Sequence, residues 1–275
     1  LSGINAVQER LMQMEEAQLN EQISALGNAL TEDPLCRFQT PVPSQNKIES
    51  LFFEHACWIG RELLERPVSN TLSLCKDNLY QGSFGTALFL AALGRIKKDH
   101  DVLDASRELM AGWQRQLDVT TNEEIVEQSI GIGSGIGSWV YGTLATGSFL
   151  EDGATFDLAR RFARLITPDR IVADRRLDLV SGAAGALLAF LALYRATKEE
   201  LWLDRARSCG ERLLETRMTL NENTCCWPVG PPENERCLAG FAHGAAGIGY
   251  ALSQLALFTE ASEFVQAALG GYQFE

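Results

Sequence analysis

The strongest signal for the fold is the sequence "SGAAGALLAFLALY" at residues 181–194. A polar residue, a glycine, two small residues and a second glycine precede a run that is apolar on every side. A helix that is apolar all round has to be buried. The stretch therefore predicts a core helix that begins close to Gly182 and whose small first-turn residues let other chain segments approach closely.

The same pattern occurs four times, which makes it an internal repeat. It is found as "QGSFGTALFLAAL" at 81–93, "SGIGSWVYGTLA" at 134–145, the stretch already quoted, and "HGAAGIGYALSQLAL" at 243–257. The first glycines are Gly82, Gly135, Gly182 and Gly244, spaced 53, 47 and 62 residues apart. Repeats of this length are typical of stacked supersecondary units, here helical hairpins with connections of variable length.

Amphipathic stretches separate the apolar ones. They run over residues 47–65, 100–117, 155–166 and 199–217, and each has apolar residues at helical spacing with charges on the other face. Inner apolar and outer amphipathic helices thus alternate, which predicts an all-α fold: an α/α toroid in which outer helices surround inner ones. A helical solenoid is the alternative. A further outer helix begins at "TEASEFVQAAL", residues 259–269.

The first 45 residues differ from the rest. Residues 6–30 read as a charged amphipathic helix, and residues 31–47 contain three prolines, as in a linker. We expect residues 1–45 to be a helical linker segment and residues 46–275 to be the toroid domain. The chain begins at Leu1 rather than Met, so we also expect it to be part of something longer.

Composition excludes several classes of partner. The net charge of −12 and the pI of about 4.8 argue against nucleic acid or an anionic membrane surface. No apolar run is long enough to span a bilayer, and the N-terminal stretch lacks the basic and apolar regions of a signal peptide, so we expect a cytoplasmic location. The seven cysteines form no C-x-x-C pair, which predicts buried, reduced thiols rather than a disulfide framework or a zinc knuckle.

Two residues beside the repeated glycines are candidates for chemistry. Ser134 and Ser181 precede their glycines and are expected to cap the following helices, and His243 takes that position in the last repeat. A histidine there can act as a general acid or base, or it can serve only capping and packing. Asp178, four residues before Gly182, can orient such an imidazole, or it can be an ordinary loop carboxylate.

Together, the repeated glycine motifs, "DLVSGAAG" (178–185) and "GFAHGAAGIGYAL" (240–252) resemble the lanthionine cyclase family. They are most similar to the cyclase domain of class II bifunctional lanthipeptide synthetases, over residues 45 to 270. "LNEQISAL" (19–26) resembles the linker that joins the dehydratase and cyclase domains there. The resemblance implies a toroid of seven hairpins, of which about four are present here, so we expect an incomplete ring.

The resemblance also implies a function. Such enzymes bind one zinc ion and add the cysteine thiolate of a precursor peptide to a dehydroalanine or dehydrobutyrine, derived from Ser or Thr, to give a thioether. It assigns an acid–base role to His243 and a catalytic role to Asp178. The family's zinc ligands come from a Trp-Cys-x-Gly motif and a Cys-His-Gly motif that this chain lacks. We therefore expect the parent protein to be a cyclase and the isolated chain to be inactive.

Three alternatives stay open at this point. Cys225, Cys226, Cys237 and His243 could form a substitute zinc site, although adjacent cysteines rarely share one ion. The chain could be a non-catalytic remnant or a peptide-binding module. It could also be a carbohydrate-active α/α toroid enzyme, for which Trp139, Trp202 and Trp227 would be the aromatic platforms, but no carboxylate pair stands out.

Overall fold

The computed structural model describes residues 37–38, 57–63, 70–74, 77–80, 82–119, 128–229 and 236–274. The predicted helix within residues 1–45 lies outside them. The chain divides into two compact units: one contains Leu1–Cys75 and Phe89–Gly112, and the other contains Lys76–Leu88 and Trp113–Glu275. The second unit carries every candidate functional residue.

The first unit contains a small antiparallel sheet. Its strands are β1 (Arg37–Phe38), β2 (Cys57–Leu63) and β3 (Asn70–Leu74), in the order β1-β2-β3. The helix predicted over residues 47–65 is therefore wrong for 57–63: Cys57 and Trp58 pair with β1, and the rest pair with β3 from Ile59↔Leu74 to Leu63↔Asn70. The conformation of a short apolar stretch depends on the segments that it pairs with. Periodicity within the stretch itself does not reveal a partner strand elsewhere in the chain.

Helical hairpins make up most of the described chain. The inner helices are α4 (Ser83–Lys97), α7 (Ile136–Leu150), α10 (Ala183–Thr197) and α12 (Ala245–Thr259). The outer helices are α5 (His100–Val119), α8 (Gly153–Leu165), α11 (Glu200–Thr216) and α13 (Ser262–Phe274), and the short α9 (Pro168–Ala173) follows α8. From α4 onward, the predicted alternation of apolar and amphipathic helices is confirmed.

The repeat is visible in the helix ends. Each inner helix begins at the residue after the first glycine of its motif and is 15 residues long. Each is followed by a residue in the left-handed conformation: Lys98, Glu151, Lys198 and Glu260, with φ between 54° and 60°. Such a residue reverses the chain after a helix, so the outer helix begins two residues later and forms a tight hairpin with the inner one.

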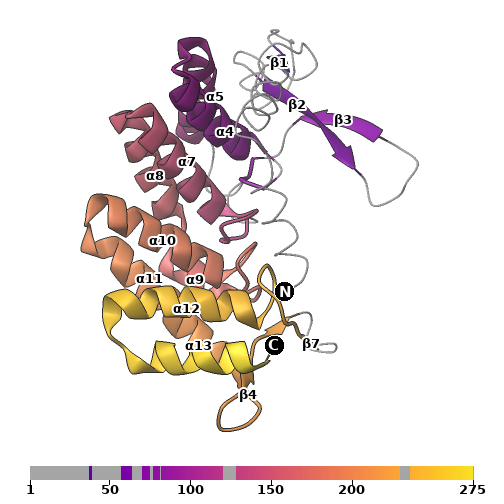
Figure 1. Ribbon diagram of the computed structural model, residues 1–275, viewed down its shortest axis with the longest axis vertical. Helices are drawn as coiled ribbons and strands as arrows, with labels where there is room; N and C mark the ends of the chain where they lie inside the picture. Colours follow the sequence, from indigo (N-terminus) through magenta and orange to yellow (C-terminus); the bar gives the residue numbers. More distant parts are fainter. Residues whose placement is uncertain are drawn as a thin grey trace, which may run out of the picture. The chain divides into compact units, whose positions relative to one another are not determined.

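In the second unit the hairpins stack side by side (Figure 1). Helix α10 contacts both α7 and α12. Each of these three inner helices also packs on its own outer helix, which is α8 for α7, α11 for α10 and α13 for α12. Most side chains of α7 and α10 are buried, whereas α8 and α11 bury one face. The architecture is all-α, with an inner and an outer layer of helices, as the sequence predicts.

Tryptophans fill the space between the layers. Trp139 stacks near Phe84 and meets Phe162 edge-on, and Trp202 stacks on Phe190. The three tryptophans considered as sugar platforms are at most 7% exposed. Buried rings cannot present a face to a sugar, so these tryptophans do not support the carbohydrate-active alternative.

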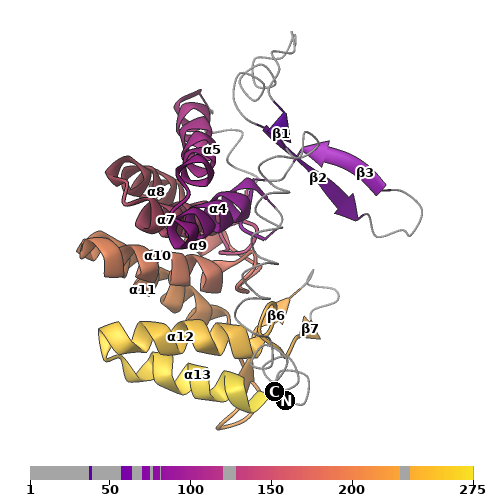
Figure 2. The same ribbon diagram turned by 45° about the horizontal axis from the view of Figure 1, so that its top comes forward.

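A segment of short strands joins α11 to α12 (Figure 2). Strand β4 (Met218–Thr219) pairs with β5 (Cys225–Cys226), and β6 (Pro228–Val229) pairs with β7 (Arg236–Cys237). A disulfide joins Cys226 to Cys237, with Cα atoms 5.8 Å apart. The expectation that all cysteines are reduced is therefore wrong for this pair, because folding brings together residues whose sequence spacing matches no known motif.

Candidate functional site

The turns that precede the inner helices are joined by backbone hydrogen bonds. In the second unit, Tyr80 N–H donates to Gly133 O, and Ile132 and Gly133 donate to Leu179 O and Val180 O. The glycines permit this approach, since a Cβ on Gly131 would lie 2.4 Å from the backbone of Ser181. The N-terminal turns of α7 and α10 therefore form one connected surface, on which Ser134, Asp178 and Ser181 lie.

Ser134 and Ser181 do not cap the helices, contrary to the prediction. The N-cap residues are Gly135 and Gly182, which have no side chain to accept a hydrogen bond. The two serine hydroxyls instead lie 2.9 Å apart and bridge the neighbouring turns. The same one-residue shift makes Gly244, not His243, the N-cap of α12.

Asp178 is held at the turn before α10. Its Oδ1 accepts the N–H of Ser181 at 2.6 Å, and its main-chain oxygen accepts the N–H groups of Gly182 and Gly185. The preceding residue, Leu177, is buried and has φ 61°, a conformation that is costly for a residue with a bulky side chain. The surrounding bonds therefore fix the direction in which the carboxylate points.

A second carboxylate, Asp174, stabilises this turn. Its Oδ2 accepts the N–H of Leu177 at 3.0 Å and that of Ala183, the first residue of α10, at 2.8 Å. Arg212 donates two hydrogen bonds to its main-chain oxygen. Burial raises the pKa of Asp174, an effect that its backbone N–H partners partly offset. Sequence reasoning missed this residue, because it precedes the helix that it caps by nine positions.

Replacing Asp174 with alanine should lower the free energy of unfolding by about 2–4 kcal/mol, because the turn N–H groups at Leu177 and Ala183 lose their acceptor. Chemical denaturation measures the change. Asp169, an exposed aspartate in the first turn of α9, is the control, and its replacement should cost less than about 1 kcal/mol. Equal losses at the two positions would show that Asp174 does not hold the turn.

The side chains of His243 and Asp178, which belong to successive repeats, form a hydrogen bond. The His243 ring nitrogen Nδ1 lies 2.8 Å from Oδ2 of Asp178, although the residues are 65 positions apart. Because a carboxylate only accepts, Nδ1 carries the hydrogen and donates it. The His243 side chain is 55% exposed, whereas that of Asp178 is only 10% exposed. The structure thus brings together the two site residues predicted from the sequence.

This arrangement can transfer a proton. With Nδ1–H bound to Asp178, the lone pair of a neutral imidazole lies on Nε2, which is the atom left to contact a substrate. The carboxylate stabilises the positive charge that forms when Nε2 takes up a proton. A buried carboxylate behind a half-exposed imidazole has the geometry in which such a pair can act as a general acid and base.

The described residues do not form a zinc centre. Zinc in proteins is held by three or four Cys, His, Asp or Glu side chains, and no group of three or more such residues lies together in the described ranges. The substitute site considered above is ruled out as proposed, because Cys226 and Cys237 are bonded to each other. Burial raises the pKa of the free thiols of Cys225 and Cys209, which disfavours the thiolate that metal binding needs.

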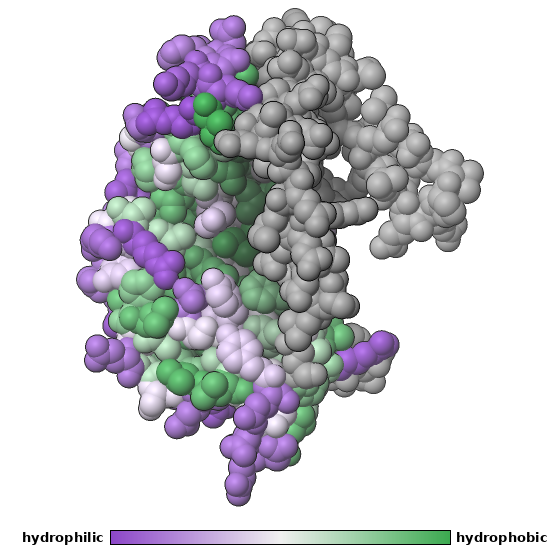
Figure 3. All heavy atoms as spheres, viewed as in Figure 1, coloured by the Kyte–Doolittle hydropathy of each residue, from purple (hydrophilic) through white to green (hydrophobic). Residues whose placement is uncertain are grey.

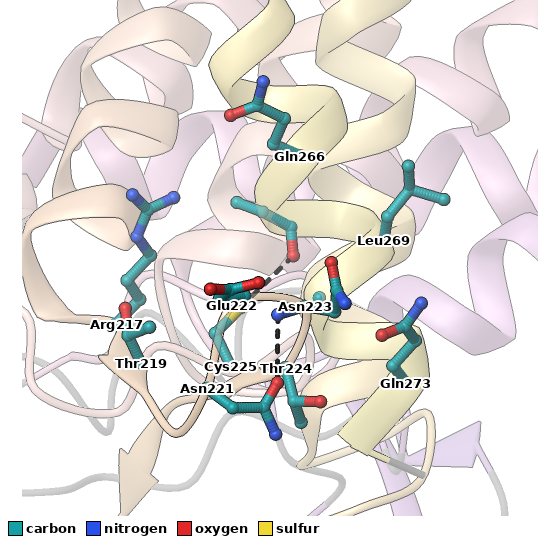
Figure 4. A pocket seen from close by; sticks show the side chains of 12 residues that line it. Arg217, Thr219, Asn221, Glu222, Asn223, Thr224, Cys225, Gln266, Leu269 and Gln273 are labelled. Carbon is teal, nitrogen blue, oxygen red and sulfur yellow. Dashed lines mark hydrogen bonds between the residues drawn. The ribbon is translucent and has the colours of Figure 1, made fainter.

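A pocket of about 490 Å³ lies elsewhere, between the β4–β5 hairpin and the second half of α13 (Figure 4). Arg217, Glu222, Gln266 and Gln273 line it, and the Cys225 thiol contributes to its wall and donates to Ala267 O at 3.4 Å. Neither His243 nor Asp178 lines this pocket. Figure 3 shows the polar character of the nearby hairpin and the apolar surface over α12 and α13. Leu257 of α12 and Leu269 of α13 are exposed.

The fold and the site define a class: an all-α protein of repeated inner and outer helices with a histidine–aspartate pair at the inner-helix turns. Comparison with protein families identifies the family within it. The chain belongs to the lanthionine synthetase C-like family, whose model matches residues 73–275. A search among curated proteins found no match. No helix in the described ranges is both long and apolar enough to cross a membrane.

Proposed function

We propose that the chain is the cyclase part of a class II bifunctional lanthipeptide synthetase. It adds a cysteine thiol of a precursor peptide to a dehydroalanine or dehydrobutyrine of the same peptide, forming lanthionine or methyllanthionine. Family membership and the contact between His243 and Asp178 support the proposal. The contact carries most weight, because thioether formation needs a proton donor at a fixed position.

The addition can be followed atom by atom. The thiol sulfur forms a bond to Cβ of the dehydro residue, and the electron pair of the C=C bond moves into an enolate. Nε2 of His243 takes up the proton that the thiol loses, and the N–H so formed then delivers a proton to Cα of the enolate. Asp178 holds the ring through Nδ1 and stabilises the imidazolium between these two transfers. The thiol hydrogen is thus replaced by the new S–C bond, and Cα gains one hydrogen.

The resemblance to zinc-dependent cyclases implies a metal that would lower the pKa of the substrate thiol. Because the described residues do not fit such a site, no step above depends on it. The partner that we propose is a dehydrated precursor peptide with a free cysteine. A neutral or basic peptide suits a chain whose net charge is −12.

Replacing Asp178 with asparagine tests the assignment. The variant keeps the size of the side chain but loses the charge that stabilises the imidazolium, so kcat should fall about 100-fold or more. KM for the peptide should change little, because Asp178 is nearly buried behind His243. The assay uses the intact protein that contains this chain, and counts peptide thiols still open to alkylation.

The same assay includes a control variant and distinguishes a cyclase from a peptide-binding module. Asp169→Asn, at an exposed position, should leave the rate unchanged. If the protein is a peptide-binding module without chemistry, wild type will bind the labelled precursor peptide but will leave all its thiols open to alkylation. A wild-type kcat in the D178N variant would show that Asp178 has no role in the mechanism.

A further inference from the structure

The segment that carries His243 has few buried side chains, although the Phe241 ring contacts Tyr250 and His243 bonds to Asp178. Between residues 236 and 243, only Cys237 and Gly240 are partly buried, and the other side chains are exposed. Among the described residues, two residue pairs join β7 to β6, Ala245 N–H donates to Leu238 O, and Gly247 N–H donates to Gly240 O. Segments with few buried contacts open easily. An additional covalent link to the core would therefore restrict the opening of this segment.

The Cys226–Cys237 disulfide is that attachment. Cys226 is 1% exposed and lies in β5, which pairs with β4. The adjacent Trp227 is buried, and its ring N–H donates to Leu213 O of α11 at 2.7 Å. Cys237 lies six positions before His243 in the sequence. The disulfide therefore joins the exposed segment, close to its catalytic histidine, to a rigid part of the core.

We propose that Cys226 and Cys237 form a reversible redox site that controls the position of His243, with a dithiol as its reductant. Cys237 is the more accessible sulfur, so a thiolate of the dithiol attacks there. The Cys226–Cys237 bond breaks, and Cys226 leaves and takes up a proton. The second thiol of the reductant then displaces Cys237, which is also protonated. The protein gains two electrons and two protons, and the dithiol becomes a disulfide.

Reduction removes the covalent link but leaves the hydrogen bonds. The segment can then open around the two β6–β7 residue pairs, and the distance between His243 and Asp178 is no longer maintained. In the cytoplasm that we expect for this protein, reducing systems are present, so the state of the pair would follow the redox conditions. The effect on catalysis rests on the function proposed above, whereas the effect on the segment does not.

Hydrogen exchange of the intact protein tests the structural effect directly. The amides of Ala245 and Gly247 report on the segment, because their acceptors lie in it, and the helical amide of Ile248, bonded to Gly244 O, is the internal control. Treatment with dithiothreitol should accelerate exchange at the two reporter amides about tenfold or more, and that of Ile248 far less. Exchange within a factor of about two of the oxidised protein would overturn the proposal.

Two variants complete the experiment. Cys237→Ser should show the fast exchange with and without dithiothreitol. Cys225→Ser removes the neighbouring thiol, which is not part of the bond, and should respond as wild type does. Loss of the response in C225S, or its persistence in C237S, would also contradict the proposal.

Thioether formation is measured on the same samples, after the reductant is removed because thiols themselves add to dehydroalanine. A slower rate in the reduced form and in C237S supports control of catalysis. An equal rate in the oxidised and reduced forms would overturn it. If exchange responds but neither form makes a thioether, the proposed function fails while the redox site stands.

Discussion

Replacing His243 with asparagine should lower the rate of thioether formation by about 10²- to 10⁴-fold, the usual contribution of a general acid–base residue. Asparagine can still donate to Oδ2 of Asp178 but cannot take up or release a proton. The side chain is 55% exposed and lies outside the helix, so stability should change by less than about 1 kcal/mol. Alkylation of the remaining peptide thiols, followed over time, gives the rate.

His100 offers a matched control. It is exposed at the start of α5 and lies among no candidate residues, so His100→Asn should keep the wild-type rate. A second variant, His243→Ala, leaves space at an exposed position, and added imidazole should restore part of its rate. Wild-type turnover in both His243 variants would show that the proton comes from another group.

A large effect on stability is expected at Gly182. An alanine Cβ there would lie 2.2 Å from Leu177 N, 2.6 Å from Asp178 N and 2.7 Å from Leu177 C. These are backbone atoms of the turn that holds Asp178, and they cannot move aside as the end of a flexible side chain can. Gly182→Ala should therefore lower the free energy of unfolding by about 3 kcal/mol or more, as measured by chemical denaturation.

The comparison for this prediction is Gly153, the first residue of α8, where a Cβ would meet nothing within 4 Å. Gly153→Ala should be neutral or stabilise the protein by about 0.4–1 kcal/mol, because alanine restricts the unfolded chain. If G182A unfolds at the same denaturant concentration as G153A, the close packing of the turn does not contribute to stability.

The repeated helices could be predicted from the sequence because their signal is local. Every inner helix begins where its glycine motif places it, and the apolar and amphipathic periods distinguish the two layers. Strand β2 could not be predicted, because its conformation depends on pairing with β3. The Cys226–Cys237 bond likewise depends on two short hairpins that have no periodicity.

The candidate site, too, could be predicted from the sequence only in part. His243 and Asp178 could be chosen because both lie beside repeated glycines and match motifs of the family that the sequence resembles, and stacking of the repeats brings their turns together. The hydrogen bonds that hold the surrounding turns could not be predicted. Asp174 acts on a helix start nine residues away, and the paired serines use neighbouring turns rather than their own helices. Such contacts depend on the tertiary arrangement of the turns.

The stereochemistry of cyclisation in D₂O tests the central claim most directly. If His243, held by Asp178, delivers the proton, each thioether formed by the intact protein should carry one deuteron at Cα, added to one face, and only one epimer should be found. Uncatalysed addition has no fixed donor and gives both epimers. A mixture of epimers equal to that of the uncatalysed reaction would contradict the account, because it would mean that no positioned group protonates the enolate.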